Sequence, residues 1–261
     1  MLMPERHNQI VEILSEKQTI TVNELSEILD VSSVTVRNDL NQLAEQGRLM
    51  RTHGGATIAG ERVRQEYTFA TRQNLHAGRK QAIGELAATL VRPMESILLD
   101  ASTTSLAVGI AIKRQPDLVD LTVVCTGVWT AMEMLGMPNI NVMVAGGHLR
   151  TTTGSITGSI AHEMLRNFHI QKAFLGAWGL SLAEGLTDTN LQEVELKRCI
   201  VDRSRELIAV VDGSKFGQVG LASFAAVDKI THIVTDNTAP LDQIQAFRDR
   251  GIEVLVAESA S

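Results

Sequence analysis

The sequence lacks any apolar run approaching the ~20 residues that a membrane-spanning helix needs, which excludes a transmembrane-helix protein. Its N-terminus, Met1-Leu-Met-Pro-Glu-Arg6, also lacks the long apolar core of a signal peptide, so we expect the protein to stay in the cytoplasm. The 261 residues are 44% hydrophobic and 21% charged, which is typical of a soluble globular protein. A chain of this length favours two domains over one.

Cysteine is scarce, and the two that are present, Cys125 and Cys199, lie far apart in mainly apolar segments. We expect buried free thiols, because a disulfide or a metal site would be unusual with this count and context. The seven histidines show no spacing with serine or cysteine that is typical of a catalytic triad, and none that is typical of a metal site. We therefore expect no metal and no cofactor.

Basic residues are also fewer than acidic ones, 24 against 30. The formal net charge is −6 and the isoelectric point is about 5.7. Taken alone, this balance argues against a protein that coats nucleic acid nonspecifically. Any DNA-binding function therefore has to depend on a local group of residues.

Three short helical patterns open the chain, over residues 4–15, 21–29 and 32–46. The second begins with a capping box in which Thr21 and Glu24 satisfy each other's backbone donors. Ser32 is a good N-cap for the third, and Gly47 ends it. The apolar residues that recur at helical spacing are expected to face inward: Ile10, Ile13 and Leu14, then Leu25, Ile28 and Leu29, then Val36, Leu40 and Leu43.

Residues 48–57 resemble a short hairpin with a diglycine turn at Gly54-Gly55. Three compact helices followed by a two-stranded wing predict a winged helix-turn-helix over residues 1–57. Residues 58–76 are expected to be a polar linker. The pattern from Gly78 to Val91 predicts the next helix.

From Ser96 onward, short apolar strands alternate with helical stretches. This alternation predicts a mostly parallel sheet covered by helices on both faces, so residues 77–261 should form a larger α/β domain. The expected strands are Ile97–Leu99, Leu121–Cys125, Ile140–Val144, Ala173–Leu175, Leu207–Val211, Ile230–Val234 and Ile252–Val256.

The face of the third helix opposite its apolar stripe is polar. Arg37 can fork onto guanine, and Asn38 and Asn41 can pair with adenine, in the major groove. Hydroxyls at the helix N-terminus can hold phosphate, and basic residues of the wing can reach the backbone or the minor groove. The alternative is a solvated helix with ordinary surface polar groups. The candidate DNA contacts are Ser32, Ser33, Thr35, Arg37, Asn38, Asn41, Arg48, Arg51 and His53.

Residues 1–56 contain five bases and eight acids, but three of the bases, Arg37, Arg48 and Arg51, fall in the predicted recognition helix and wing. We therefore expect few phosphate contacts and a shallow salt dependence per subunit. Useful affinity for DNA would then need two or more subunits, as in a homodimer or a homotetramer.

Polar loops follow several of the predicted strands. Hydroxyls and N–H groups between Asp100 and Ser105, at a strand-to-helix turn, can cradle an anion, and Asp100 can accept from a sugar hydroxyl. Ligands of open α/β sheets gather outside the carboxyl ends of strands, so such loops reinforce one another. The alternative is that the Asp100–Ser105 turn is only a helix cap, that the glycines only form turns, and that Lys215 is an ordinary surface charge. The candidate ligand-binding residues are Asp100, Ser102, Thr103, Thr104, Thr126, Gly127, Gly147, Gly176, Asp212 and Lys215.

The N-terminal sequence resembles the DeoR family of bacterial sugar-metabolism repressors. The residues that carry this resemblance are Val31-Ser-Ser-Val-Thr-Val-Arg-Asn-Asp-Leu40, Leu43, Gly47, Leu49, Arg51 and His53-Gly-Gly-Ala56. Many members have two adjacent arginines where this chain has Arg37-Asn38. This departure leaves the family resemblance intact but means that the operator sequence does not follow from it.

The C-terminal sequence is similar to the sensor domain of the same family. Matching stretches are Asp100–Thr104, Ala145–Arg150, Phe174–Gly179, Gly185–Thr187, Asp212–Phe216 and Val234–Asp236. The resemblance implies a fold related to ribose-5-phosphate isomerase and CoA transferases, with a phosphorylated sugar as effector and operator DNA as partner. Ser102 replaces the glycine of the usual Gly-Thr-Thr loop, and Thr126-Gly127 is most similar to the amino-sugar branch.

The alternative function is a sugar-phosphate isomerase or hydrolase. Asp188, Glu193, Glu195 and Lys197 follow Gly185-Leu-Thr and include the carboxylate base and the cation that such chemistry needs. We favour a pair of Glu193 with Lys197 on one helix turn, or a role in ligand binding, over catalysis. The sequence thus predicts a repressor of a sugar-utilisation operon that is not an enzyme.

Overall fold

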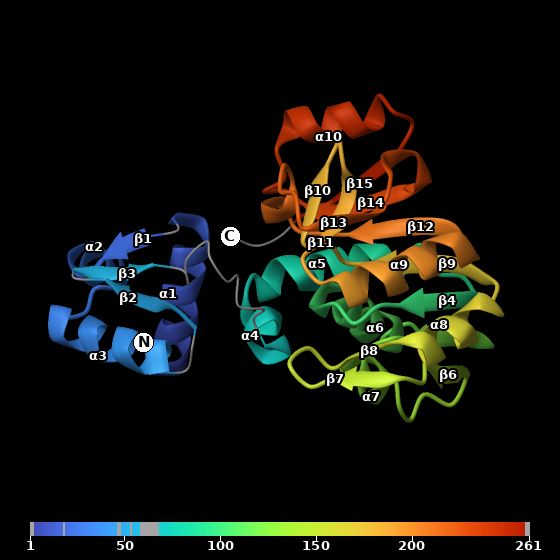
Figure 1. Cartoon of the computed structure of the whole chain (residues 1–261), viewed down its shortest axis with the longest axis horizontal. Helices are drawn as coiled ribbons and strands as arrows, with labels where there is room; N and C mark the ends of the chain where they lie inside the picture. The colour runs from blue at the N-terminus through green and yellow to red at the C-terminus, as the bar shows by residue number, and fades with distance from the viewer. Residues whose placement is uncertain (1–2, 18, 46–47, 53, 58–67, 259–261) are drawn as a thin grey trace. The chain divides into compact units, whose positions relative to one another are not determined.

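The structure is a computed structural model that describes residues 3–17, 19–45, 48–52, 54–57 and 68–258. The chain divides into two compact units, Met1–His76 and Ala77–Ser261 (Figure 1). Among the described residues, no helix combines the length and the apolar character needed to cross a membrane.

The first unit is a winged helix-turn-helix, as predicted. Its elements are α1 (Met3–Lys17), β1 (Thr19–Thr21), α2 (Val22–Leu29), α3 (Ser33–Glu45), β2 (Met50–Thr52), β3 (Gly55–Thr57) and α4 (Phe69–Asn74). The predicted capping box of Thr21 and Glu24 is present at the start of α2. Strands β2 and β3 form the antiparallel wing, with Arg51 opposite Ala56.

The core of this unit contains most of the predicted inward residues. Ile10 and Leu14 of α1 are fully buried, and Ile13 is half-buried against them. Val36, Leu40 and Leu43 of α3 are fully buried too. The prediction for Ile28 was wrong, because its side chain is 46% exposed. On the short helix α2 the buried stripe is Val22, Leu25 and Leu29, and Ile28 lies about 100° of helical rotation from Leu29.

Strand β1 was missing from the sequence prediction because three residues are too few to show a period. It pairs antiparallel with β3 and gives a sheet in the order β1-β3-β2. A Cβ on Gly55 would lie 2.0 Å from the Ile20 carbonyl oxygen, so this position of the wing needs glycine.

Part of the segment expected as a linker has a regular structure. Thr68 caps α4 by accepting a hydrogen bond from the Thr71 N–H. Leu75 packs against the core of the first unit, and His76 Nδ1 lies 3.1 Å from Glu12 Oε1 of α1. The other part of that segment, residues 58–67, lies outside the described residues.

The second unit contains a seven-stranded parallel sheet, which confirms the predicted α/β class. Its strands run in the order β15-β14-β12-β9-β4-β5-β6. They are β4 (Ser96–Leu99), β5 (Leu121–Cys125), β6 (Ile140–Val144), β9 (Ile170–Leu175), β12 (Ser204–Val210), β14 (His232–Asp236) and β15 (Glu253–Ala257).

Helices cover both faces of this sheet (Figure 1). On one face the core contains α5 (Ala77–Ala88), α6 (Thr103–Lys113) and α7 (Val128–Glu133). On the other it contains α8 (Ser159–Arg166), α9 (Leu191–Arg203) and α10 (Leu241–Arg248). Two short 3-10 helices, Gly213–Lys215 and Val227–Lys229, complete the helical elements of the described residues.

Two small antiparallel sheets accompany the large one and were not predicted. Strands β7 (His148–Arg150) and β8 (Ser155–Thr157) form a hairpin. Strands β10 (Gly179–Ser181), β11 (Gly185–Asp188) and β13 (Ala222–Ala225) form a three-stranded sheet.

The order of the large sheet reverses between β4 and β9. From β4 the chain adds β5 and β6 on one side, and it then returns to place β9, β12, β14 and β15 on the other. In open α/β sheets, ligands bind outside the carboxyl ends of the two strands at such a reversal, and we call this region between β4 and β9 the crevice.

Both cysteines are free, as expected, but only Cys125 is buried, whereas Cys199 is half-exposed. Burial raises the pKa of the Cys125 thiol to about 12, so this residue behaves as a small apolar side chain.

Candidate functional sites

Helix α3 presents the polar face that the sequence predicted. Arg37, Asn38 and Asn41 are exposed, and the structure adds exposed Gln42 one position further. At the N-terminus the Thr35 N–H donates to Ser32 Oγ at 3.1 Å, and the two hydroxyl oxygens lie 2.9 Å apart. Ser32 therefore caps the helix while its hydroxyl and that of Thr35 stay near the surface, beside half-buried Ser33.

A buried ion cluster that the sequence reasoning missed fixes the opposite face of α3. Asp39 is 3% exposed and lies 2.6 Å from Arg6 Nε and 3.0 Å from His7 Nε2, both on α1. Burial of the carboxyl would raise the pKa of Asp39, but the hydrogen bonds from Arg6 and His7 hold it below its usual value. An acidic residue inside an otherwise amphipathic helix pattern was the available signal.

The predicted DNA contacts of the wing differ in their surroundings. Arg51 is exposed, and its Nη1 donates to the Gly55 carbonyl at 2.8 Å. Arg48 is half-buried, and its Nη2 donates to Asn8 Oδ1 of α1 at 3.0 Å. This hydrogen bond directs Arg48 to the protein's own first helix. His53 lies outside the described residues.

The carboxyl ends of β9, β4 and β5 bring Gly176, Asp100 and Thr126 together, all buried. Asp100 Oδ1 accepts from the Ser102 N–H at 3.0 Å, and Oδ2 accepts from the Gly176 N–H at 3.1 Å. The Asp100 carboxylate thus ties two loops across the reversal point of the sheet. A Cβ on Gly176 would lie 2.5 Å from the Ser102 side chain, so the loops approach as closely as glycine allows.

The N-terminus of α6 opens beside Asp100. Ser102 caps this helix by accepting from the Ser105 N–H at 3.1 Å. Thr103 and Thr104 follow, at 7% and 6% exposure, and their hydroxyls make no hydrogen bond to any other residue that the structure describes. Because the first N–H groups of a helix have no partner within it, this turn offers hydroxyl and backbone donors to an anion.

A buried cation lies on the other side of Asp100. Lys197 Nζ of α9 donates to the Gly176 carbonyl and to Asp188 Oδ2, both at 2.8 Å, and lies 3.4 Å from Asp100 Oδ2. Burial lowers the pKa of Lys197, but the carboxylates of Asp188 and Asp100 more than offset that effect, so the pKa lies above its usual value. Lys197 is therefore a fixed cation at neutral pH.

The helix-turn pair expected between Glu193 and Lys197 is replaced by other partners. Glu193 Oε1 accepts from Arg150 Nη1 of β7 at 2.7 Å and from the Ser155 hydroxyl of β8. Lys197 instead turns to Asp188 and the crevice. The sequence indicated Arg150 only as part of the stretch Ala145–Arg150 and did not indicate Ser155 or the contact of either with Glu193, because their hairpin is too short to predict.

This β7–β8 hairpin also joins the loop after β5. The Ile156 N–H donates to the Thr126 carbonyl at 2.8 Å, and Gly127 forms an antiparallel bridge with Ser155. A Cβ on Gly127 would lie 2.7 Å from Ala101 Cα, so glycine is needed for the loops after β4 and β5 to meet.

The remaining candidates lie farther along the same edge of the sheet. Asp212 follows β12, is 2% exposed, and accepts from the Ser214 N–H at 3.0 Å. Lys215 is half-buried in the 3-10 turn that follows. Gly147, with φ +147, follows β6, two strands from β4. The structure thus gathers seven of the ten candidates at β9, β4 and β5: Asp100, Ser102, Thr103, Thr104, Thr126, Gly127 and Gly176.

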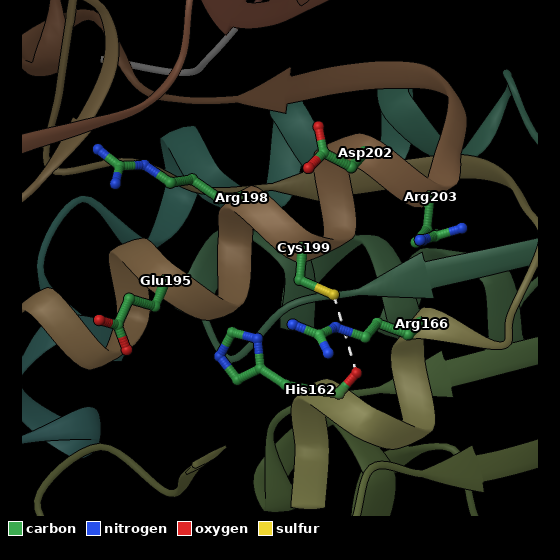
Figure 2. A pocket seen from close by; sticks show the side chains of 7 residues that line it. All are labelled: His162, Arg166, Glu195, Arg198, Cys199, Asp202 and Arg203. Atoms are coloured by element: carbon green, nitrogen blue, oxygen red, sulfur yellow. Dashed lines mark hydrogen bonds between the residues drawn. The ribbon is translucent and has the colours of Figure 1, made fainter. Parts of the chain in front are cut away.

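A separate pocket of about 290 Å³ lies between α8 and α9 (Figure 2). In Figure 2 the Cys199 thiol points toward the His162 carbonyl, at 3.9 Å, with the Arg166 side chain beside it. Glu195, a candidate base in the enzyme alternative, lines this pocket and not the crevice. The lining residues are His162, Arg166, Glu195, Arg198, Cys199, Asp202 and Arg203.

Comparison with known families divides the chain in the same order as its two units. Residues 6–62 match the DeoR-like helix-turn-helix domain. Residues 75–237 match the DeoR C terminal sensor domain.

Curated relatives match the chain over nearly its full length. It is 38% identical over 255 residues to the HTH-type transcriptional regulator GolR of Listeria innocua, covering 97% of this chain and 98% of that protein. It is 30% identical over 253 residues to the putative aga operon transcriptional repressor of Escherichia coli O157:H7, covering 97% and 93%. It is 28% identical over 254 residues to the glycerol-3-phosphate regulon repressor of Escherichia coli K12, covering 97% and 99%.

Among solved structures, ribose 5 phosphate isomerase A from Neisseria gonorrhoeae is similar over 52% of each chain, with a TM-score of 0.39 and 13% identity. That likeness is too distant to bear on activity.

Proposed function

The chain belongs to the DeoR family of DNA-binding transcriptional regulators, and we propose that it represses a sugar-utilisation operon under the control of a phosphorylated sugar. In this proposal residues 1–57 read the operator, residues 77–261 bind the effector and residues 58–76 couple the two. The observation that carries the proposal is the crevice between β4 and β9. There the hydroxyls of Thr103 and Thr104, which have no hydrogen-bond partner among the described residues, lie at a helix N-terminus next to the carboxylate of Asp100.

Two chemistries meet in this crevice, and a phosphorylated sugar has both. The first turn of α6 supplies hydroxyl and N–H donors suited to a phosphate. Asp100 and Asp188 carry carboxylate oxygens that can accept hydrogen bonds from sugar hydroxyls, and both lie beside the ammonium group of Lys197. The relatives named for an aga operon and for a glycerol-3-phosphate regulon support a phosphorylated carbohydrate as the effector class.

The reading of DNA is assigned to the exposed face of α3. Arg37, Asn38 and Asn41 carry the donors and acceptors that distinguish base pairs in the major groove. Ser32, Ser33 and Thr35 lie where a phosphate can approach the helix N-terminus, and Arg51 lies on the wing. Since each subunit offers few cations, we assign operator binding to a homodimer or a larger assembly.

Binding without turnover fits the crevice better than isomerase chemistry. A catalytic base has to be available to take a proton from the substrate. Glu193 is bound by Arg150 and Ser155, and Asp188 is paired with Lys197. Glu195 lines the pocket between α8 and α9. The carboxylates that the sequence offered for catalysis therefore serve other contacts.

The test is a thermal-shift screen of sugar phosphates against the whole protein, followed by operator titration with each stabilising compound. A ligand at 100 times its dissociation constant adds about 2.7 kcal/mol to the free energy of unfolding. The replacement Thr103→Val keeps the side-chain shape and removes a hydroxyl from the first turn of α6, so the stabilisation should fall sharply.

The matched control is Thr122→Val, at the opposite end of the neighbouring strand β5, which should respond as the wild type does. The proposal fails if no sugar phosphate alters operator binding, or if both variants keep the full response. Conversion of a sugar phosphate into product during the same incubations would favour the enzyme alternative.

A further inference from the structure

The large parallel sheet ends at β6, and this edge has an unusual composition. The fifteen residues from Met134 to His148 contain no lysine, arginine, aspartate or glutamate. At the other edge, β15 begins with Glu253 and is followed by Glu258. Natural edge strands are commonly protected by charged residues, because an open edge is a template for another strand. The β6 edge lacks that protection.

The backbone direction of β6 can be derived from one hydrogen bond. Ala145 donates its N–H to the Cys125 carbonyl of β5 at 3.0 Å. In a parallel ladder, alternate residues direct both their N–H and their C=O to the same neighbour. The N–H and C=O groups of Val142 and Val144 therefore point away from β5. Within the part of the chain that the structure describes, β5 is the only strand paired with β6.

Exposed apolar side chains surround this edge. We define the β6 edge surface as Trp129, Met132, Leu135, Val144, Leu149 and Ile160, with exposed fractions of 46%, 58%, 67%, 44%, 46% and 64%. Helix α7, which contributes Trp129 and Met132, packs against β6. A Cβ on Gly146, just past β6, would lie 3.6 Å from Ile160. Large apolar side chains that are exposed on the elements beside an open strand edge are typical of an interaction site.

The occupant that fits best is a second copy of the same strand. A two-fold axis would pair β6 with itself in the antiparallel direction, so that Val142 and Val144 exchange backbone hydrogen bonds with their counterparts. Like charges directly opposite each other destabilise a strand pair, and β6 carries none. The edge is thus electrostatically compatible with itself.

We propose that the protein forms a two-fold homodimer through the β6 edge surface, with the two sheets joined into one across paired β6 strands. This inference rests on the proposed function only in that the pair supplies the second winged helix for an operator with two half-sites. The interface itself is independent of which effector or operator is recognised.

The first test is sedimentation velocity of the full chain over a range of concentrations, with no DNA present. Val144→Lys places two lysines near the axis, and Val144→Pro removes the outward N–H while leaving the ladder to β5 intact. Each should weaken the dimer by at least tenfold. The control Leu241→Lys replaces another exposed apolar residue, 81% exposed on α10, and should leave the dimer unchanged.

The second test needs no substitution and covers the case in which a variant fails to fold. In the dimer the Val142 and Val144 amide hydrogens should exchange slowly with deuterium. On dilution they should become fast-exchanging over the same concentration range in which the dimer dissociates into monomers. A wild-type chain that stays monomeric, or a dimer that the Val144 variants leave intact, overturns the proposal. Protection that survives in the monomer overturns it too.

These outcomes separate the two ideas. A dimer that is lost on Val144→Lys but never binds DNA would contradict the proposed function and keep the interface. A wild-type protein that binds an operator while the amides of β6 remain unprotected would support the proposed function and contradict the interface.

Discussion

Asp39 of α3 lies 2.6 Å from Nε of Arg6 on α1, and Asp39 is only 3% exposed. This pair joins the helix that is assigned to reading DNA to the first helix of the chain. Buried ion pairs contribute little over a well-packed apolar pair, but breaking one leaves an uncompensated charge. The orientation of α3 therefore depends on both partners being present.

Replacing Asp39 by alanine should destabilise the winged helix by about 3–5 kcal/mol, because Arg6 and His7 lose their acceptor. Urea unfolding, followed by a probe in the first unit, measures this. The control Glu27→Ala, at an exposed position of α2, should change the stability by less than about 0.5 kcal/mol. Equal effects of the two variants would contradict a structural role for the cluster.

The same cluster predicts a dependence on pH. The pKa of Asp39 is lowered in the folded protein, so its contribution to stability is present above its unfolded pKa, about 3.9, and is lost as pH falls through the folded value. Acid titration of the unfolding free energy from pH 6 downward should show this loss. Asp39→Asn should reduce the loss of unfolding free energy at low pH. If that free energy depends on pH as it does in the wild type, Asp39 is not the source of the dependence.

Lys197→Met should weaken the second unit, because the buried carboxylate of Asp100 and the half-buried carboxylate of Asp188 would lose their cation. The expected cost is about 3–5 kcal/mol in the free energy of unfolding. Thermal unfolding of the sensor unit measures it, and Lys229→Met, at an exposed lysine, is the control. If Lys197→Met melts as the wild type does, the ion cluster of the crevice contributes nothing to the fold.

Arg37→Ala should cost about 1–3 kcal/mol in specific DNA binding while effector binding by the sensor unit persists. Affinity for a nonspecific duplex should fall less, because a contact to a base edge contributes to the binding of the correct sequence and little to the binding of other sequences. Arg114→Ala, which removes an exposed arginine from the second unit, is the matched control. Unchanged operator affinity in the Arg37 variant would refute the assignment of α3 as the recognition helix.

The sequence predicted those parts of the fold that have a period long enough to detect. The stripe of Val36, Leu40 and Leu43 identified α3, and the apolar runs identified the strands of the large sheet within a few residues. Strands β1, β7 and β8 have three residues each, so their pairing could not be inferred from alternation. Ile28 shows the opposite limit, because one short helix cannot bury every apolar residue that it carries.

The loops of the crevice were predictable, but its ion pairs were not. Parallel strands bring their carboxyl ends to one edge, which is why Asp100 and Gly176 could be placed together from their positions after strands. The partner of Lys197 depends on how α9 lies across that edge. Spacing alone favoured Glu193, four residues earlier, whereas both side chains are buried and have different partners, Lys197 contacting Asp188 and Glu193 contacting Arg150.

In that arrangement helix α9 connects the β7–β8 hairpin to the crevice. Glu193 and Lys197 are one turn apart on α9, and Glu193 contacts Arg150 and Ser155 of the β7–β8 hairpin while Lys197 contacts Gly176 and Asp188 beside the crevice. A ligand that displaced the Lys197 ammonium group would therefore act on the same helix turn that holds the hairpin. Occupancy of the crevice can in this way be transmitted to a surface that the occupant never touches.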